Sequence, residues 1–494
     1  MSVEARAAAS PRRVEIAIIG SGFTGLGMGI RLRQAGVEDF EILERADDHG
    51  GTWRDNAYPG CAVDVQSHLY SYSFAPNPDW SRVYAPREEI WAYIKRSAEQ
   101  FGVTEHVRFG HEVLSAEWRE TAQRWAIDTS AGPIEARFLI SAMGQLSERS
   151  LPAIPGLDAF PGTVFHSAAW DNGHDLSGER VAVIGTGASA AQLVPEIQPR
   201  VGRLLVFQRT PAWTFPRLNR RITTLERGLY RRFPGLQRLV RRRQYWARES
   251  LGILFQRPGR ARLIERFARA RLRWQIPDPA LRAKVTPDYR IGCKRIIVSD
   301  DFHRTLTRDN VEVITSPIQE VRGSSIVTSD GAEHPVDTII LATGFHPIAL
   351  ADPLRGRDGV ALAERWAGRR EAYLGTAVSG YPNYFMLMGP NTATGHTSIL
   401  LYAEAQIEYI IACLEHLRRS RLSSCEVRPE AQAAFNRALR ERLKDTVWTS
   451  GGCASWYLDA DGGTSVLWPG YTWQFARALR RFDPAAYELR TASG

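Results

Sequence analysis

VEIAIIGSGFTG, residues 14–25, decides the fold of this chain. VEIAII is an apolar, β-branched run that stops at a glycine, which is typical of a buried parallel strand. GSGFTG then opens a helical pattern that continues to Ala35, and FEILE (40–44) has the composition of the next strand. A strand, a glycine-rich turn, a helix and a second strand form one βαβ unit, so the sequence predicts a doubly wound α/β fold.

The glycine spacing in this turn is that of a dinucleotide-binding site. Gly20 permits a tight turn, Gly22 lets the backbone approach a pyrophosphate, and Gly25 lets the helix pack closely on the strand. Glu44 ends the second strand, 24 residues after Gly20, where a carboxylate can accept hydrogen bonds from a ribose diol. We therefore predict a dinucleotide site here, and a glycine-rich turn without a ligand is the alternative.

A second strand–helix–strand pattern follows far downstream in the chain. RVAVIG (180–185) has strand composition, TGASAAQLVPEI (186–197) forms a turn and a helix, and RLLVFQ (203–208) is the next strand. Two such units in one chain imply two Rossmann-like, doubly wound dinucleotide-binding domains.

The second unit carries the motif Gly185-x-Gly187-x-x-Ala190, and its strand end is basic. Counting 24 residues from Gly185, the same offset as before, reaches Arg209 instead of a carboxylate. A guanidinium at this point can pair with a 2′-phosphate, which an acid would repel, so this site should prefer NADPH over NADH. A solvated charge at a strand end is the alternative for Arg209. The expected contacts of this site also include Ser189 and Thr210.

The acidic strand end of the first unit and the basic strand end of the second together favour FAD plus NADPH. We predict that residues 1–155 and 335–494 form a discontinuous FAD-binding domain and that residues 156–334 form the NADPH-binding domain. Within the latter, residues 217–290 form a basic, mostly helical insertion, because their Leu, Phe, Tyr and Trp residues recur with rough helical periodicity.

The charge of the chain is distributed unevenly. Residues 217–290 contain 20 Arg and 1 Lys against 5 acidic residues, a net charge of +16; since the whole chain carries +9, the remainder carries −7. A basic segment on an acidic body indicates a surface role of its own: a helical cap near the substrate entrance, peripheral contact with an anionic membrane, or the binding of a partner. No nucleic acid partner is expected, because no recognised nucleic-acid-binding module accompanies the charge.

The five cysteines are scattered and odd in number: Cys61, Cys293, Cys413, Cys425 and Cys453. Because none stands in a CxxC or Cys/His spacing, we expect neither a disulfide framework nor a metal site, and a reducing, cytoplasmic location fits best. A disulfide reductase with FAD and NADPH would need a CxxxxC pair, and Cys61 has no partner at that spacing. The remaining chemistry for this cofactor pair is the loading of oxygen onto reduced flavin and its insertion into a substrate.

Residues 160–171, FPGTVFHSAAWD, place Phe160, Gly162, His166 and Trp170 at the spacing F-x-G-x-x-x-H-x-x-x-W. This stretch resembles the fingerprint of the Baeyer–Villiger monooxygenases, a group within the class B flavoprotein monooxygenases. N- and S-oxidising flavin monooxygenases look similar, but they usually have Tyr or Phe where Trp170 stands. Other matching stretches are GGTW (50–53), YPGCAVDVQSHLYSYSF (58–74), ATGF (342–345) and GPN (389–391).

The resemblance implies a set of active-site residues. Lys294 matches the lysine that helps hold the NADP 2′-phosphate, Arg295 matches the arginine that faces the flavin, and Asp64 matches the aspartate that partners this arginine. A fixed guanidinium in a water-poor pocket would stabilise a peroxyflavin anion and the charge that develops when it attacks a ketone. A structural ion pair is the alternative for Asp64 and Arg295. Further cofactor contacts are implied for Gly51, Thr52, Trp53 and Asn391.

The activity implied by the resemblance is insertion of one oxygen atom of O2 beside a ketone carbonyl to give an ester or lactone, with FAD and NADPH as cofactors. Two alternatives stay open. One is a flavin-containing monooxygenase that oxidises sulfur or nitrogen and has less need of Arg295. The other is a non-enzymatic flavoprotein that serves as a binding module at a membrane or partner surface.

Two further stretches allow more than one interpretation. The fingerprint lies just before the second dinucleotide motif, so we interpret it as a hinge between the two domains, with His166 either a satisfied structural histidine or a participant in the chemistry. The Trp- and Gly-rich stretch 448–473 is either a cover over the substrate pocket or ordinary aromatic packing.

Overall fold

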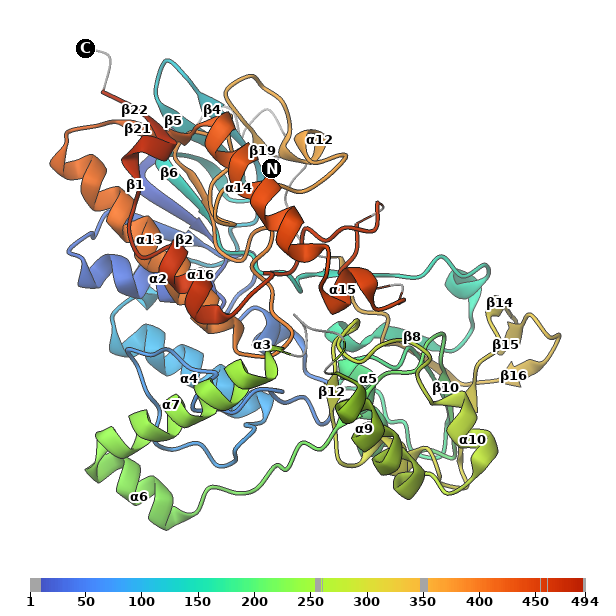
Figure 1. Ribbon diagram of the computed structural model, residues 1–494. Coiled ribbons are helices and arrows are strands. Elements are labelled where there is room, and N and C mark those ends of the chain that lie inside the picture. Colours follow the sequence, from blue (N-terminus) through green and yellow to red (C-terminus); the bar gives the residue numbers. More distant parts are fainter. Residues whose placement is uncertain are drawn as a thin grey trace.

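The computed structural model describes residues 10–253, 259, 261–346, 354–453, 455–459 and 461–491. The chain folds around two separate parallel-stranded sheets, which lie at the upper left and the lower right of Figure 1. The α/β fold class with two such units, predicted from the repeated strand–glycine–helix pattern, is confirmed.

The first unit is built on an eight-stranded mixed sheet. Its strands run in the order β19-β4-β5-β6-β1-β2-β3, and β20 also pairs with β6. The pairings of β1 with β2 and β6 are parallel, while β5 is antiparallel to both of its neighbours. The strands are β1 (Arg12–Ile19), β2 (Phe40–Leu43), β3 (Val107–Arg108), β4 (Val113–Arg119), β5 (Arg124–Thr129), β6 (Gly132–Ser141), β19 (Leu354–Arg355) and β20 (Tyr384–Met386).

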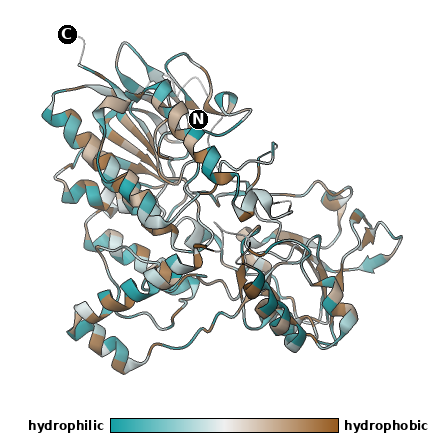
Figure 2. Ribbon diagram, in the orientation of Figure 1, coloured by the Kyte–Doolittle hydropathy of each residue, from teal (hydrophilic) through white to brown (hydrophobic). Residues whose placement is uncertain are grey.

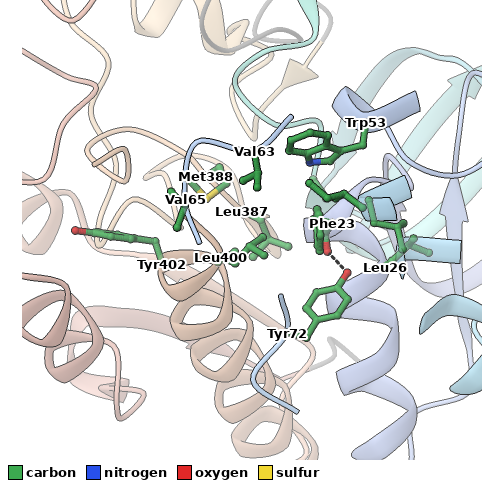
Figure 3. Packing of buried hydrophobic residues seen from close by; sticks show 14 of the residues in the cluster. Phe23, Leu26, Trp53, Val63, Val65, Tyr72, Leu387, Met388, Leu400 and Tyr402 are labelled. Carbon is green, nitrogen blue, oxygen red and sulfur yellow. Dashed lines mark hydrogen bonds between the residues drawn. The ribbon is translucent and has the colours of Figure 1, made fainter. Parts of the chain in front are cut away.

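The apolar run in β1 is buried on both faces of this sheet. Ile16 and Ile18 belong to one hydrophobic cluster and Ala17 and Ile19 to another, because successive side chains of a strand point to opposite faces. Helices α2 (Phe23–Gln34) and α13 (Ile399–Arg419) pack against each other within the larger cluster, part of which is shown in Figure 3. The glycine turn between β1 and α2 is thereby held at the carboxyl end of a central strand.

The second unit is a five-stranded parallel sheet in the order β13-β10-β9-β17-β8. Helix α5 (Ala188–Ile197) follows β9 and returns the chain to β10, which completes the second predicted βαβ unit. The strands are β8 (Thr163–His166), β9 (Arg180–Ile184), β10 (Arg203–Phe207), β13 (Val311–Ile314) and β17 (Thr338–Leu341).

The domain boundary predicted at residue 335 is wrong. β17 pairs in parallel with both β8 and β9, so the second unit extends to residue 341. A strand-like sequence does not specify the sheet it joins, because pairing partners are chosen by tertiary contacts. The chain crosses between the units in β7 (Glu148–Arg149) and again in β18 (Phe345–His346), and these two crossing segments pair with each other.

The basic stretch 217–290 is helical, as predicted, but it does not belong to one domain. Helices α6 (Thr224–Arg232) and α7 (Pro234–Leu251) lie against the first unit, where Gln237 donates a hydrogen bond to the carbonyl of Asn77. Helices α9 (Ala261–Gln275) and α10 (Pro279–Lys284) lie against the second unit, where Gln275 donates to the carbonyl of Asp300. Its assignment to the NADPH domain is therefore wrong for α6 and α7.

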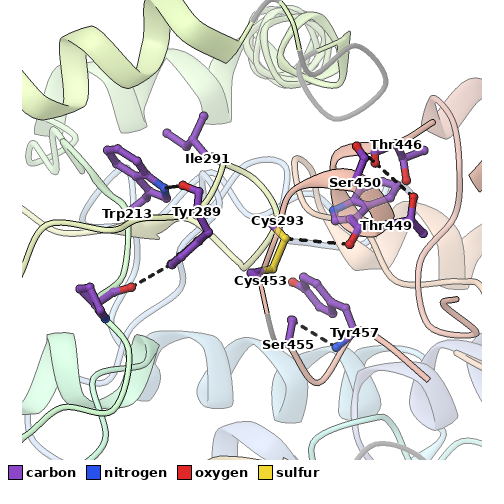
Figure 4. Close-up of a disulfide and its surroundings, with 12 residues drawn as sticks. Trp213, Tyr289, Ile291, Cys293, Thr446, Thr449, Ser450, Cys453, Ser455 and Tyr457 are labelled. Carbon is purple, nitrogen blue, oxygen red and sulfur yellow. Dashed lines mark hydrogen bonds between the residues drawn. A yellow bond between two sulfur atoms is a disulfide. The ribbon is translucent and has the colours of Figure 1, made fainter. Parts of the chain in front are cut away.

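The expectation that the cysteines form no disulfide is also wrong. Cys293 and Cys453 are joined by a disulfide, with Cα atoms 6.1 Å apart and a separation of 160 positions in the sequence (Figure 4). Spacing motifs detect only pairs that are close in sequence, so this contact had no local signature. Cys61, Cys413 and Cys425 are free and buried.

The remaining elements link and flank these units. None of the helices in the described parts of the chain is long and apolar enough to cross a membrane. The helices are α3 (Thr52–Asp55), α4 (Arg87–Gln100), α11 (Phe302–Thr305), α12 (Leu362–Arg365), α14 (Pro429–Leu443), α15 (Val447–Ser450) and α16 (Thr472–Ala478). The short strands are β11 (Thr214–Phe215), β12 (Ile297–Val298), β14 (Ile318–Arg322), β15 (Ser325–Thr328), β16 (Glu333–Pro335), β21 (Ser424–Val427) and β22 (Tyr487–Arg490).

Candidate active site

A cavity of about 430 Å³ lies where the carboxyl ends of β1, β2 and β6 meet. Ligands of doubly wound folds bind outside these strand ends. Arg295, which follows the second sheet unit's helices in the sequence, also reaches this cavity. The predicted cofactor residues in its lining are Gly20, Gly22, Glu44, Gly51, Thr52 and Trp53.

The first glycine motif leaves a bare backbone surface at this cavity. A Cβ atom on Gly25 would lie 1.9 Å from the carbonyl oxygen of Gly20, so close packing of α2 on the turn excludes any side chain there. Gly20 has φ +99°, a left-handed conformation that favours glycine. A Cβ on Gly22 would meet nothing closer than the Cα of Gly51, at 3.9 Å. This uncovered backbone at the start of α2 fits the pyrophosphate of FAD.

Glu44 is held in its ionised form at the end of β2. Its Oε2 accepts hydrogen bonds from the backbone N–H and the hydroxyl of Ser21, and its Oε1 accepts from Ala46 N and Arg54 Nη1. Burial alone would raise the pKa of Glu44, but these hydrogen bonds and the Arg54 charge hold it below its ordinary value. A ribose diol would have to share or replace one of these donors, and the rotatable hydroxyl of Ser21 is the one most easily displaced.

GGTW (50–53) lies across from the glycine turn and lines the same cavity. Gly50 and Gly51 have φ of +129° and +50°, and α3 begins directly after them. The indole N–H of Trp53 donates to the hydroxyl of Tyr70, another residue of the lining. The wall therefore combines glycine backbone with a fixed aromatic ring, which suits a planar flavin.

The second glycine motif has the same construction at the start of α5. Gly185 has φ +111°, and a Cβ there would lie 2.4 Å from the carbonyl oxygen of Ala342. A Cβ on Gly187, the residue that caps α5, would meet nothing within 4 Å, so the helix start is open. Thr186 Oγ1 donates to the carbonyl of Thr210, tying the loop after β10 to this turn, and Ser189 lies in the first turn of α5. The open helix start fits the pyrophosphate of NADP.

Two cations, Arg209 and Lys294, lie near each other beside this second site. Burial lowers the pKa of Lys294, and the charge of Arg209 lowers it further. The Lys294 ammonium also lies 5.3 Å from the ring centre of Tyr289. The charge of Arg209 disfavours the protonated form of Lys294, so a bound dianion such as the 2′-phosphate of NADP would be favoured beside them.

Asp64 and Arg295 form the ion pair at the cavity. Arg295 Nη2 donates to Asp64 Oδ2, and 45% of the Arg295 side chain remains exposed, on the side that lines the cavity. The Asp64 charge raises the pKa of Arg295 against the opposing effect of burial. Burial would raise the pKa of Asp64, but Arg295 holds it below its ordinary value. The guanidinium is therefore permanently charged. Asp64 holds it in one orientation, and its exposed side faces the cavity.

Comparison with known proteins agrees with this geometry. The model of the flavin-binding monooxygenase-like family matches residues 13–349. The chain belongs to this family. It is 48% identical to a Baeyer–Villiger monooxygenase of Streptomyces coelicolor and 46% identical to one of Pseudomonas aeruginosa; these alignments cover 96% and 98% of this chain and 92% and 93% of the relatives.

Solved structures give the same result for the fold of this monooxygenase. Cyclohexanone monooxygenase from Rhodococcus sp. Phi1 bound to NADP+ superposes with a TM-score of 0.87 at 27% identity, covering 98% of this chain and 100% of that one. A complex of OTEMO with FAD and NADP also superposes with a TM-score of 0.87 at 27% identity, covering 97% and 100%. The predicted resemblance to Baeyer–Villiger monooxygenases is confirmed.

Two arginines of the basic stretch contact the backbone of the segment that carries Asp64. Arg248, in the last turn of α7, donates to the carbonyl of Asp64 at 3.3 Å and to Oε1 of Gln66 at 2.9 Å. Arg217 donates to the carbonyl of Val63 at 3.0 Å. Neither was singled out from the sequence, where each is one of many arginines without a motif. The charge of Arg248 also contributes to the lowered pKa of Asp64.

The last turn of α7 also reaches the other side of the cavity. Glu249 is buried, its Oε1 lies 3.3 Å from His396 Nε2, and its Oε2 accepts from Thr472 N. His396 Nδ1 in turn lies 3.0 Å from the hydroxyl of Thr394, which lines the cavity. The adjacent residues Arg248 and Glu249 of α7 therefore hold two different segments of the site: Arg248 contacts the Asp64 segment, and Glu249 contacts His396 next to Thr394.

The Trp- and Gly-rich stretch contributes to the cavity in part. Trp456 and Tyr457 line it, whereas Trp468 packs in the core. The disulfide fixes this stretch to the segment that carries Arg295, since Cys293 lies two residues before Arg295 (Figure 4). Asn391, in contrast, donates its side-chain N–H groups to the carbonyls of Thr464 and Leu467, so it anchors this stretch instead of facing the cavity.

The fingerprint residues lie at the junction between the units, away from the cavity. The Nδ1 of His166 accepts from Ala168 N, which leaves Nε2 to donate to the carbonyl of Gly344 beside the crossing segment β18. A Cβ on Gly162 would lie 2.2 Å from the carbonyl oxygen of Asp337. Phe160 is buried in the core of the second unit, and Trp170 packs edge-on against Phe165. These contacts support the structural interpretation of His166.

Proposed function

We propose that this enzyme is a Baeyer–Villiger monooxygenase that converts a ketone, NADPH, a proton and O2 into an ester or lactone, NADP+ and water. The observation that carries the proposal is the Asp64–Arg295 pair at a cavity bordered by the first glycine motif. When bound, FAD takes a hydride from NADPH and then activates O2 for transfer to the substrate.

The residues around the cavity supply positioning and charge. Arg295 presents N–H donors toward the cavity, where they can stabilise the negative charge that develops on oxygen when a carbonyl is attacked. Asp64 keeps the planar guanidinium of Arg295 in one orientation. A lysine in place of Arg295 would supply a single point charge without this fixed plane of donors. Trp456 and Tyr457 line part of the same space. Their aromatic rings would limit the entry of water when substrate is bound, and this would strengthen these electrostatic interactions.

The nucleotide preference follows from the second site. Lys294 and Arg209 supply two positive charges beside the open start of α5, and this supports NADPH as the reductant over NADH. A cytoplasmic location stays a prediction: the need for NADPH supports it, whereas the disulfide removes the cysteine argument on which it rested.

The test is purification of the enzyme followed by a coupled assay. We expect a yellow protein with bound FAD, ketone-dependent oxidation of NADPH, and a product that is one oxygen atom heavier than the ketone and has the mass spectrum of an ester. Oxidation of sulfides or amines with ketones inert would replace this proposal with the sulfur- or nitrogen-oxidising alternative. A protein that binds FAD but oxidises NADPH no faster with any of these substrates would contradict both.

A further inference from the structure

Exposed apolar side chains are concentrated in the basic stretch 217–290. Eleven of the sixteen large hydrophobic side chains that are exposed among the described residues belong to it, although it makes up a small part of the chain. Exposed apolar residues scattered singly are ordinary, but a concentration on one surface marks an interaction site.

Six of these side chains follow the outward side of α6 and α7. Within α6 they recur at an interval of four residues and within α7 at intervals of three and seven, so each helix carries them on one side, and Phe233 lies between the two helices. Leu225 and Trp246 are 74% and 52% exposed. The six residues, called the hairpin face below, are Leu225, Leu229, Phe233, Leu236, Leu239 and Trp246.

The opposite side of α7 is occupied by the enzyme itself. Gln237 is buried, Arg241 donates to the carbonyls of His68, Leu69 and Ser71, and Arg248 holds the Asp64 segment. The hairpin face therefore points away from the first unit. All six of its side chains remain exposed in the described parts of the chain.

Helix α9 has the same construction. Leu263, Phe267 and Trp274 recur at intervals of four and seven residues, and Leu263 and Trp274 are 73% and 67% exposed. Glu265, Ala268 and Leu272 on the other side are buried. In Figure 1, α6, α7 and α9 all lie along the lower side of the molecule, away from the large sheet, and Figure 2 shows hydrophobic and hydrophilic residues interspersed along these helices.

Unpaired arginines accompany both apolar stripes. Each has an exposed side chain, and none forms an ion pair with a carboxylate in the described parts of the chain; they are Arg238, Arg242 and Arg243 on α7 and Arg262, Arg266 and Arg273 on α9. Apolar side chains with tryptophan on the outward side, flanked by arginine, are the composition of a helix that lies in the interface of a membrane.

We propose that the hairpin face and the α9 stripe dock the enzyme peripherally on an anionic lipid bilayer. The net charge of +16 in this stretch is complementary to anionic headgroups, and the leucines and tryptophans would enter the region just beneath them. A second copy of the chain does not satisfy the surface in the same way, because a symmetric contact would bring arginines against arginines. Nucleic acid would match the charge but not the leucines.

The experiment is flotation of the FAD-loaded enzyme with unilamellar vesicles of two compositions. One consists of phosphatidylcholine and the other of equal parts phosphatidylcholine and phosphatidylglycerol. We expect binding at least about tenfold stronger to the vesicles with phosphatidylglycerol, and loss of this difference at high salt, since the headgroup attraction is screened within about a Debye length.

Two double variants separate charge from apolar insertion. Arg242→Glu with Arg243→Glu should abolish the preference for anionic vesicles, while Arg418→Glu with Arg437→Glu, an equal change of charge at exposed sites on α13 and α14, should leave it intact.

Leu239→Ser with Trp246→Ser should weaken vesicle binding, while the exposed Leu114→Ser with Leu151→Ser should not. NADPH oxidation in solution should be retained in all four, which shows that they are folded holoenzymes.

Three outcomes would overturn the proposal. The first is the absence of vesicle binding by the unaltered enzyme. The second is equal binding to both lipid compositions, or equal loss in the α7 variants and their controls. The third is a dimer, measured by light scattering, that the Leu239→Ser/Trp246→Ser variant converts to a monomer, because this would assign the hairpin face to a second copy. The test does not depend on which substrate is oxidised.

Discussion

Arg295 and Asp64 lie 231 positions apart in the sequence, and the hydrogen bond from Arg295 Nη2 to Asp64 Oδ2 joins the two parts of the chain at the cavity. The arginine follows the helices on the second unit, and the aspartate follows GGTW of the first. Correct docking of the two units is therefore a condition for the pair. The site and the domain arrangement are tested together when this pair is altered.

Loss of the Arg295 guanidinium should strongly slow ester formation without loss of FAD. We expect Arg295→Ala to lower the rate of ester formation by about 10² to 10³, the usual cost of removing one donor to a developing oxyanion. Arg295→Lys should be only partly active, because a lysine lacks the planar fork. The measurement is ester formed per NADPH consumed, with hydrogen peroxide as the uncoupled product. Arg322→Ala on the distant β14 should behave as the unaltered enzyme, and an Arg295→Ala enzyme with full ester yield would contradict the assigned role.

The choice between NADPH and NADH should depend on Arg209 and Lys294. Replacing either with Ala removes a charge-assisted contact to the 2′-phosphate, so we expect KM for NADPH to rise by about tenfold to a hundredfold. KM for NADH should change little, because NADH lacks this phosphate. Steady-state kinetics with both reductants measures the ratio. An equal rise for the two nucleotides would assign these residues to general structure instead of phosphate recognition.

The parts of the site that could be predicted from the sequence are those with a local signature. The turn around Gly20 and the turn around Gly185 each depend on glycines that are close in sequence and on the strand before them, so their geometry followed from short-range sterics. Arg209 and Glu44 followed from their distance to these turns. Asp64 and Arg295 needed the resemblance to a family, because nothing local distinguishes them from other aspartates and arginines.

Contacts between distant segments were not accessible in this way. Arg248 reaches Asp64 only because α7 packs on the first unit, and the Cys293–Cys453 disulfide closes 160 residues. β17 has a clear strand sequence, but its place between β8 and β9 is decided by pairing. Composition identified 217–290 as a separate surface element, and only the fold divided it between the two units.

Arg248 should act as a positioning residue for the ion pair. Its removal leaves the carbonyl of Asp64 and the amide of Gln66 without their donor, which should let Asp64 and hence Arg295 move. We expect Arg248→Ala to lower kcat for ester formation several-fold and to raise the share of hydrogen peroxide, with KM for NADPH unchanged. Arg248→Lys should restore part of the coupling. The exposed neighbour Ser250→Ala serves as the control on the same turn, and a variant that alters KM for NADPH alone would contradict this role.

Acid should destabilise the fold, because two buried histidines stay neutral in the folded chain at a pH where they are protonated in the unfolded chain. Burial lowers the pKa of His68 and of His303 to about 4 from an ordinary value of 6.5. Between these values the unfolded chain binds a proton that the folded chain does not, so the free energy of unfolding is greatest above pH 6.5 and falls as the pH drops toward 4. Each histidine can contribute up to about 3 kcal/mol to this loss.

The measurement is the melting temperature between pH 7 and pH 4 for the unaltered enzyme and for His303→Gln. His303 lies beside the hydroxyl of Thr214 and the side-chain oxygen of Gln275, and a neutral amide can keep one of these contacts without titrating. We expect the variant to be less stable at pH 7 but to lose less stability on acidification. His346→Gln, at an exposed site, should keep the original pH dependence. Parallel curves for His303→Gln and the unaltered enzyme would show that His303 does not supply the acid sensitivity.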